Sequence, residues 1–115
     1  MSDVGQGDVG EPSSDAQGTT RAILNLDRLV HEPARLAILT VLAEAEEVEF
    51  RFLESVTGLT KGNISSHMAK LEAAGYVTVT KRCKGRVPST SYSITDAGRA
   101  ALQAYRAALA KLMRG

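Results

Sequence analysis

Several features that mark other classes of protein are missing from this chain of 115 residues. Cys83 is its single cysteine, so an intrachain disulfide is excluded and a reducing compartment, the cytoplasm, is expected. No apolar run approaches the length that a membrane span needs. The N-terminus has neither the basic patch nor the apolar stretch of a secretory signal, and we therefore expect a protein that is not exported.

The motifs of the common catalytic and metal sites are also missing. The sequence contains no glycine-rich phosphate loop, no nucleophile elbow and no H-E-x-x-H motif. His31, His67 and Cys83 are too few and too scattered for a structural zinc site, which normally has four ligands. We therefore predict no catalytic residue, no metal and no cofactor. Cys83 lies between Arg82 and Lys84, which favour its thiolate, so a redox role and an incidental thiol both stay open.

A large net charge is absent too, because the chain carries only +1, but the charge is unevenly distributed. Residues 1–19 hold four acidic side chains and no basic one. Residues 44–54 hold five acidic side chains and one basic one, which we interpret as the solvated end of a helix. Residues 61–91 hold six basic side chains and one acidic one. This basic segment indicates either a polyanionic partner or a solvated basic face.

Composition divides the chain into a tail and one domain. Residues 1–19 are rich in Gly, Ser and Asp and have few large apolar side chains, which predicts a flexible acidic tail. Residues 20–115 are enough for a single domain with one modest core. The first apolar residues of this domain have helical spacing and predict a short first helix; they are Ile23, Leu24, Leu26, Leu29 and Val30.

Periodicity predicts two further helices before residue 60. One begins at Pro33, which suits the first turn of a helix, and runs to about Ala45. After a stretch at residues 48–50 that is long enough only for an edge strand, a short helix ends at Thr57. Gly58 is well placed to end it in the left-handed conformation. The predicted buried positions of the two helices are Leu36, Ile38, Leu39 and Leu42, then Phe52, Leu53, Val56 and Leu59.

A third helix is predicted from Lys61 to Ala74, and a hairpin follows it. Thr60 can cap this helix and Gly75 can end it; its buried residues would be Ile64, Met68 and Leu71. Two short helices joined by a turn containing Gly form a helix-turn-helix pattern.

After residue 75 the period changes from that of a helix to that of a strand. Segments 76–81 and 91–94 are β-branched and alternating, which predicts a hairpin with a basic loop at 83–88. Thr95 would cap a last helix over 96–113, with Asp96 at its positive end. The expected fold is mainly α with a small β-hairpin, and thus of the α+β class.

The order of these elements and three stretches of sequence resemble winged helix-turn-helix regulators of the MarR-like branch, with ArsR-like features. The stretches are HEPARLAILTVL (31–42), LTKGNISSHMAKLEAAGYV (59–77) and TSYSITDAGRAAL (90–102), and the resemblance covers residues 25–112. It implies a dimeric transcription factor whose third helix enters the major groove while the wing touches the flanking backbone. Metal-sensing members carry a cysteine pair in or near the recognition helix, and this chain lacks one.

The outward face of the third helix is small, polar and basic, as a helix that contacts DNA requires. The hairpin cations at 81–86 have no acidic neighbour in the sequence, so they suit phosphate or the minor groove, or they protect the hairpin edge from aggregation. The alternatives are an ordinary amphipathic surface helix and a winged-helix module that binds proteins instead of DNA. The predicted DNA-binding residues are Thr60, Lys61, Gly62, Asn63, Ser65, Ser66, His67, Lys70, Lys81, Arg82, Lys84 and Arg86.

Apolar stripes near both ends of the domain predict a homodimer, with packing inside one chain as the alternative. A two-fold dimer would bind an inverted repeat of double-stranded DNA with half-sites about 10 base pairs apart. A small-molecule effector, which the resemblance also implies, would have room only at the dimer interface, because no polar cluster that could fix a ligand stands out. The predicted interface residues are Ile23, Leu24, Leu26, Leu102, Tyr105, Leu109 and Leu112.

Overall fold

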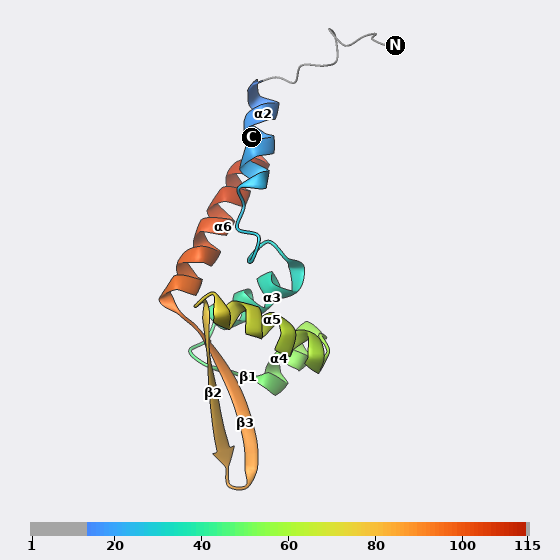
Figure 1. Cartoon of the computed structure of the whole chain (residues 1–115), viewed down its shortest axis with the longest axis vertical. Coiled ribbons are helices and arrows are strands. Elements are labelled where there is room, and N and C mark those ends of the chain that lie inside the picture. Colours follow the sequence, from blue (N-terminus) through green and yellow to red (C-terminus); the bar gives the residue numbers. More distant parts are fainter. Residues whose placement is uncertain (1–13, 115) are drawn as a thin grey trace.

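The computed structural model describes residues 14–114, in which a small antiparallel sheet extends as a long hairpin from a group of helices (Figure 1). The sheet has three strands, in the order β1 (Val48–Glu49), β3 (Val87–Ile94) and β2 (Val77–Lys84), so the predicted α+β winged-helix fold is confirmed. No helix within residues 14–114 combines the length and the hydropathy needed to cross a bilayer. The elements are α2 (Ser14–Leu24), α3 (Pro33–Ala43), β1 (Val48–Glu49), α4 (Phe50–Thr57), α5 (Lys61–Ala73), β2 (Val77–Lys84), β3 (Val87–Ile94) and α6 (Asp96–Arg114).

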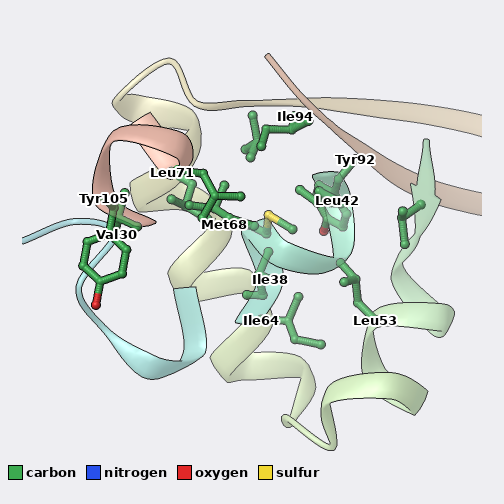
Figure 2. Close-up of a cluster of buried hydrophobic side chains, with 14 of the residues drawn as sticks. Val30, Ile38, Leu42, Leu53, Ile64, Met68, Leu71, Tyr92, Ile94 and Tyr105 are labelled. Atoms are coloured by element: carbon green, nitrogen blue, oxygen red, sulfur yellow. The ribbon is translucent and has the colours of Figure 1, made fainter. Parts of the chain in front are cut away.

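One apolar core lies between α3, α4, α5, the sheet and the first half of α6 (Figure 2). Ile38, Leu53 and Ile64 are each completely buried, and they come from three different helices. Burying side chains of this size stabilises a fold by about 1.5–3 kcal/mol each relative to exposure. The core therefore fixes the position of α5 against α3 and α4.

The predictions for the N-terminal part are wrong in two respects. Helix α2 begins at Ser14, so residues 14–19 are helical and the boundary at residue 19 lies inside a helix; residues 1–13 of the predicted tail lie outside the described residues. The predicted helix through Val30 ends at Leu24 instead. Asp27 Oδ1 accepts hydrogen bonds from the N–H groups of Leu29 and Val30, which forms a turn.

Helix α4 lies where it was predicted, but its buried residues differ. It begins at Phe50, and Gly58 ends it with a φ of 71° in the left-handed region, as expected. Leu53 is buried, whereas Phe52 and Val56 are 55% and 52% exposed. Phe50 packs against Tyr92 instead, with ring centroids 6.3 Å apart. A helix of eight residues against this sheet buries only one narrow stripe, so two of the predicted core residues point to solvent.

The hairpin is longer and its turn is tighter than the sequence indicated. Strands β2 and β3 pair from Val77↔Ile94 to Lys84↔Val87, which leaves two residues in the turn. Gly85 occupies the turn with a φ of 66°, a conformation that favours glycine. The predicted edge strand exists as β1, which pairs with β3 through Val48↔Tyr92 and Glu49↔Ser91.

Helix α6 is joined closely to the turn that follows α5. The Thr95 hydroxyl donates to the carbonyl of Gly75 at 2.6 Å and accepts from the N–H of Gly98 at 3.0 Å, so the predicted cap is confirmed. The N–H of Thr95 donates to the carbonyl of Tyr76 at 2.9 Å. A Cβ at Gly98 would lie 2.2 Å from that carbonyl oxygen. Only glycine at this position allows α6 to begin so close to the backbone of the turn.

Candidate nucleic-acid interface

Helix α5 has one face in the core and the opposite face in solvent. Ile64, Met68 and Leu71 are buried, and they occupy one stripe of the helix because they are three or four residues apart. The Thr60 hydroxyl accepts a hydrogen bond from the N–H of Asn63 at 3.1 Å, so the predicted N-cap is confirmed. The exposed face contains Lys61, Gly62, Asn63, Ser65, Ser66, Ala69, Lys70 and Ala73.

His67, which was predicted to be a DNA contact, is half-buried against α3. Its Nδ1 lies 3.1 Å from Nη1 of Arg35, and its Nε2 lies 3.9 Å from the carboxylate of Glu32. The N–H of Arg35 donates to the Glu32 carboxylate at 2.8 Å, and this bond lowers the pKa of Glu32. Arg35 Nε donates to the carbonyl of Leu29 at 2.7 Å. This network attaches α5 to the start of α3, so His67 positions the helix.

The hairpin cations Arg82 and Lys84 have acidic partners, which the sequence interpretation did not foresee. Arg82 Nη1 donates to the carboxylate of Glu47, and Lys84 Nζ donates to the carboxylate of Glu49. The hydroxyl of Ser91 donates to the same oxygen of Glu47. The hydrogen bonds from Arg82 and Ser91 lower the pKa of Glu47. The interpretation of this acidic segment as only a solvated helix end is therefore wrong.

Four other predicted cations are unpaired in the part of the chain that the structure describes. Lys61 and Lys70 lie on α5, and Lys81 and Arg86 lie on the hairpin. All four are exposed, and none forms an ion pair with a residue of 14–114. Of the cations in the predicted site, these four are therefore free to bind an anion.

A cavity of about 310 Å³ lies between α4, the start of α5 and the hairpin. Lys61 and Lys84 line it together with Arg51, a basic residue that the sequence analysis did not select. Glu49 and Glu54 line the same cavity. The acidic side chains offset most of the positive charge there, so the cavity itself is not a strong anion site.

The predicted dimer interface contains three residues that a partner cannot reach. Leu26, Leu102 and Tyr105 are at most 7% exposed within the single chain, because they pack into its own core. That part of the prediction is wrong. Ile23 and Leu24 on α2 are exposed, and Leu109 and Leu112 on α6 are half-buried. Helices α2 and α6 contact each other and extend side by side away from the hairpin (Figure 1).

The two histidines and the cysteine lie apart in the structure. His31 Nδ1 is 2.6 Å from the hydroxyl of Tyr105, His67 contacts α3, and Cys83 is exposed on the hairpin. Within residues 14–114, no three His, Cys, Asp or Glu side chains lie close enough together to hold a metal ion.

Comparison with known proteins identifies the family. The family model described as winged helix DNA-binding domain matches residues 34–113. An uncharacterized protein of Methanocaldococcus jannaschii, MJ0432, is 38% identical over 79 residues, which are 68% of this chain and 85% of that protein.

Two solved structures extend the likeness. A transcriptional regulator homologue from Pyrococcus horikoshii is 28% identical with a TM-score of 0.77, over 85% of this chain and 96% of its own. A MarR-like transcription regulator from Bacillus cereus, described as putative, is 15% identical with a TM-score of 0.62, over 87% and 75% of the two chains, a likeness of fold alone. The chain belongs to the winged helix DNA-binding domain family.

Proposed function

We propose that this protein is a transcriptional regulator that binds double-stranded DNA through α5 and the hairpin. The observation that carries the proposal is the outward face of α5, which is exposed, small, polar and cationic beside a hairpin with two unpaired cations. The major groove is about 12 Å wide and admits an α-helix. In this arrangement Asn63, Ser65 and Ser66 contact base edges or phosphate oxygens. The hairpin lies on the flanking backbone or in the minor groove.

The proposal includes a homodimer formed through α2 and the far half of α6. Ile23 and Leu24 are 50% and 62% exposed, and Met113 in the last turn of α6 is 80% exposed. Large apolar side chains that remain exposed at one end of a molecule favour association with a second copy. The hairpin lies at the opposite end (Figure 1), so this contact leaves α5 uncovered in both subunits.

Removing single unpaired cations tests the DNA interface. We expect Lys70→Ala and Arg86→Ala each to weaken binding of duplex DNA by about tenfold per chain near 0.1 M salt, because each neutralised phosphate adds about 0.9 to the log–log salt slope. Fluorescence anisotropy with a labelled duplex measures the change. Lys111→Ala is the matched control, because Lys111 is exposed in the last turn of α6, far from the hairpin. Because Lys111 lies on the half of α6 assigned to the dimer, analytical ultracentrifugation must show that this control is still a dimer. An equal loss of DNA binding in a control that is still dimeric would show that the interface is assigned to the wrong end.

Gly62→Ala separates stability from DNA binding. Gly62 lies in α5, and a Cβ there would meet nothing within 4 Å. Alanine in a helix is more favourable than glycine by about 0.5–1 kcal/mol, so thermal unfolding should shift upward. The added methyl group would stand where the duplex approaches the helix, and a clash of about 1 kcal/mol weakens DNA binding about fivefold. A variant that is more stable and binds DNA with unchanged affinity would remove Gly62 from the interface.

A module that binds proteins instead of DNA is the second candidate, and the exposed pair Phe52 and Val56 favours it. Both lie on α4, four residues apart, and a protein interface is enriched in aromatic residues. The exposed face of α5, in contrast, has no aromatic residue. Absence of DNA binding at low salt, together with a stable protein complex that Phe52→Ala abolishes, would establish this second function in place of the first.

A further inference from the structure

Two carboxylates at β1 occupy cations of the hairpin that would otherwise be available to DNA. The β1–β3 register places Glu49 opposite Ser91, and the β2–β3 register places Ser91 opposite Thr80. Arg82 and Lys84 follow Thr80 at intervals of two, so their side chains leave the same face of the sheet as Glu49 and Glu47. The two ion pairs are therefore a consequence of the strand register.

The Glu47 pair is more than a contact between two mobile surface side chains. Its carboxylate also accepts a hydrogen bond from Ser91, whose residue is only 3% exposed. This bond fixes the carboxylate beside β3, within reach of Arg82. An ion pair with a fixed partner costs less side-chain entropy than an ordinary exposed pair. The Glu49–Lys84 pair lies next to it along the hairpin and has no buried partner.

We infer that Glu47 and Glu49 act as intramolecular competitors of DNA phosphate for Arg82 and Lys84, and so limit the affinity of the protein for DNA of any sequence. The inference rests on the proposed function. Sequence-independent affinity comes from cations that neutralise phosphates. A cation that is already paired gains less from a phosphate, and the adjacent carboxylate repels the DNA backbone. Because phosphate contacts carry no sequence information, the lower affinity applies to the protein's own site and to the great excess of non-specific sites alike. More of the protein therefore remains free in solution, while the ratio of specific to non-specific affinity stays the same.

Neutralising the two competitors tests this inference. We expect Glu47→Gln with Glu49→Gln to raise the affinity for a short duplex of mixed sequence by roughly tenfold per chain at low salt, since each exposed pair is worth up to about fivefold. The amide oxygen introduced at position 47 can still accept from Ser91, so the fold should persist, and a thermal melt checks this. The matched control is Glu44→Gln with Glu46→Gln, which changes the net charge equally. Glu44 and Glu46 are exposed and form no ion pair within residues 14–114.

A double-mutant cycle identifies the cations that are released. Arg82→Ala with Lys84→Ala should remove most of the gain that Glu47→Gln and Glu49→Gln produce, leaving only the part due to repulsion between the carboxylates and the DNA backbone. The two alanine substitutions should lower the DNA affinity in both backgrounds. The loss should be about tenfold smaller in the wild-type background, where the carboxylates already occupy the two cations, than in the background with both carboxylates neutralised. An equal gain from the Glu44 and Glu46 control, or an equal loss in both backgrounds, would overturn the inference. If the Glu47 change unfolds the protein, Glu49→Gln and Lys84→Ala alone repeat the cycle without touching a buried group.

The two failures are distinguishable. If wild-type protein fails to bind the duplex even at low salt, the proposed function is wrong and the inference falls with it. If wild-type protein binds and the cycle shows no coupling, only the inference is wrong.

Discussion

Binding of duplex DNA should weaken by about 10⁴-fold when the salt concentration rises from about 50 mM to about 200 mM. The reason is the four predicted DNA-contacting cations that form no ion pair within residues 14–114, namely Lys61, Lys70, Lys81 and Arg86. Each neutralised phosphate contributes about 0.9 to the slope of log affinity against log salt, so eight contacts in a dimer give a slope of about −7. Anisotropy of a labelled duplex across a potassium chloride series measures this slope.

The value of the slope distinguishes DNA binding by a dimer from DNA binding by a single chain. A slope near −4 would mean that four cations bind phosphate as proposed but that one chain binds at a time. A flat response would eliminate DNA binding through these cations. Analytical ultracentrifugation of the protein alone, at the concentrations of the binding assay, provides the independent measure of the dimer.

The Gly98→Ala variant should lose much of its stability. The new Cβ would lie 2.2 Å from the carbonyl oxygen of Tyr76 and 2.8 Å from Cγ1 of Ile94. The carbonyl cannot move away freely, because it accepts the hydrogen bond from the N–H of Thr95. Overpacking of this kind costs about 1–3 kcal/mol and occasionally more, against a total stability of about 5–15 kcal/mol. We expect the melting temperature to fall by roughly 10 °C, at about 4–8 °C per kcal/mol.

The glycine in α5 is the control for that variant. Gly62→Ala has the same chemistry in a helix but open space around the new methyl group, so its melting temperature should rise. A Gly98→Ala variant as stable as the wild type would contradict the close approach of α6 to the turn before β2. Loss of stability in both variants would point to a general intolerance of alanine, which helix propensities do not predict.

The sequence was sufficient to predict α4, α5 and the turn between them, because the local signals in this segment are strong. The Thr60 cap, the left-handed Gly58 and the change of period after Gly75 each depend on neighbouring residues only. The exposed and buried faces of α5 follow from the spacing of Ile64 and Met68. Most of the candidate site lies on that helix, and its cations are exposed as expected.

Contacts between distant residues could not be predicted in the same way. Glu47 and Arg82 are 35 residues apart, and they meet only because a strand of two residues pairs with β3. So short a strand carries no pattern from which its register can be inferred. His67 likewise showed no sign of its contact with Arg35, since both residues lie on helices whose relative position the core decides.

The errors near the N-terminus arise from apolar residues that are buried without being helical. Leu26 and Val30 have helical spacing, yet both enter the core from an irregular segment whose turn Asp27 stabilises. Apolar periodicity cannot distinguish buried residues of a helix from buried residues of an irregular segment, because apolar side chains from either kind of backbone can enter the core.

The tight junction at the base of α6 has a mechanical consequence. With 19 residues and a rise of 1.5 Å per residue, α6 is a rod about 28 Å long, and tilting it by about 5° would displace its tip by roughly 2.5 Å. In a pair of subunits joined at those tips, the same small tilt would change the distance between the two copies of α5 by a comparable amount. In the proposed dimer, the contact of Gly98 with the backbone of the turn would therefore fix the distance between the two copies of α5.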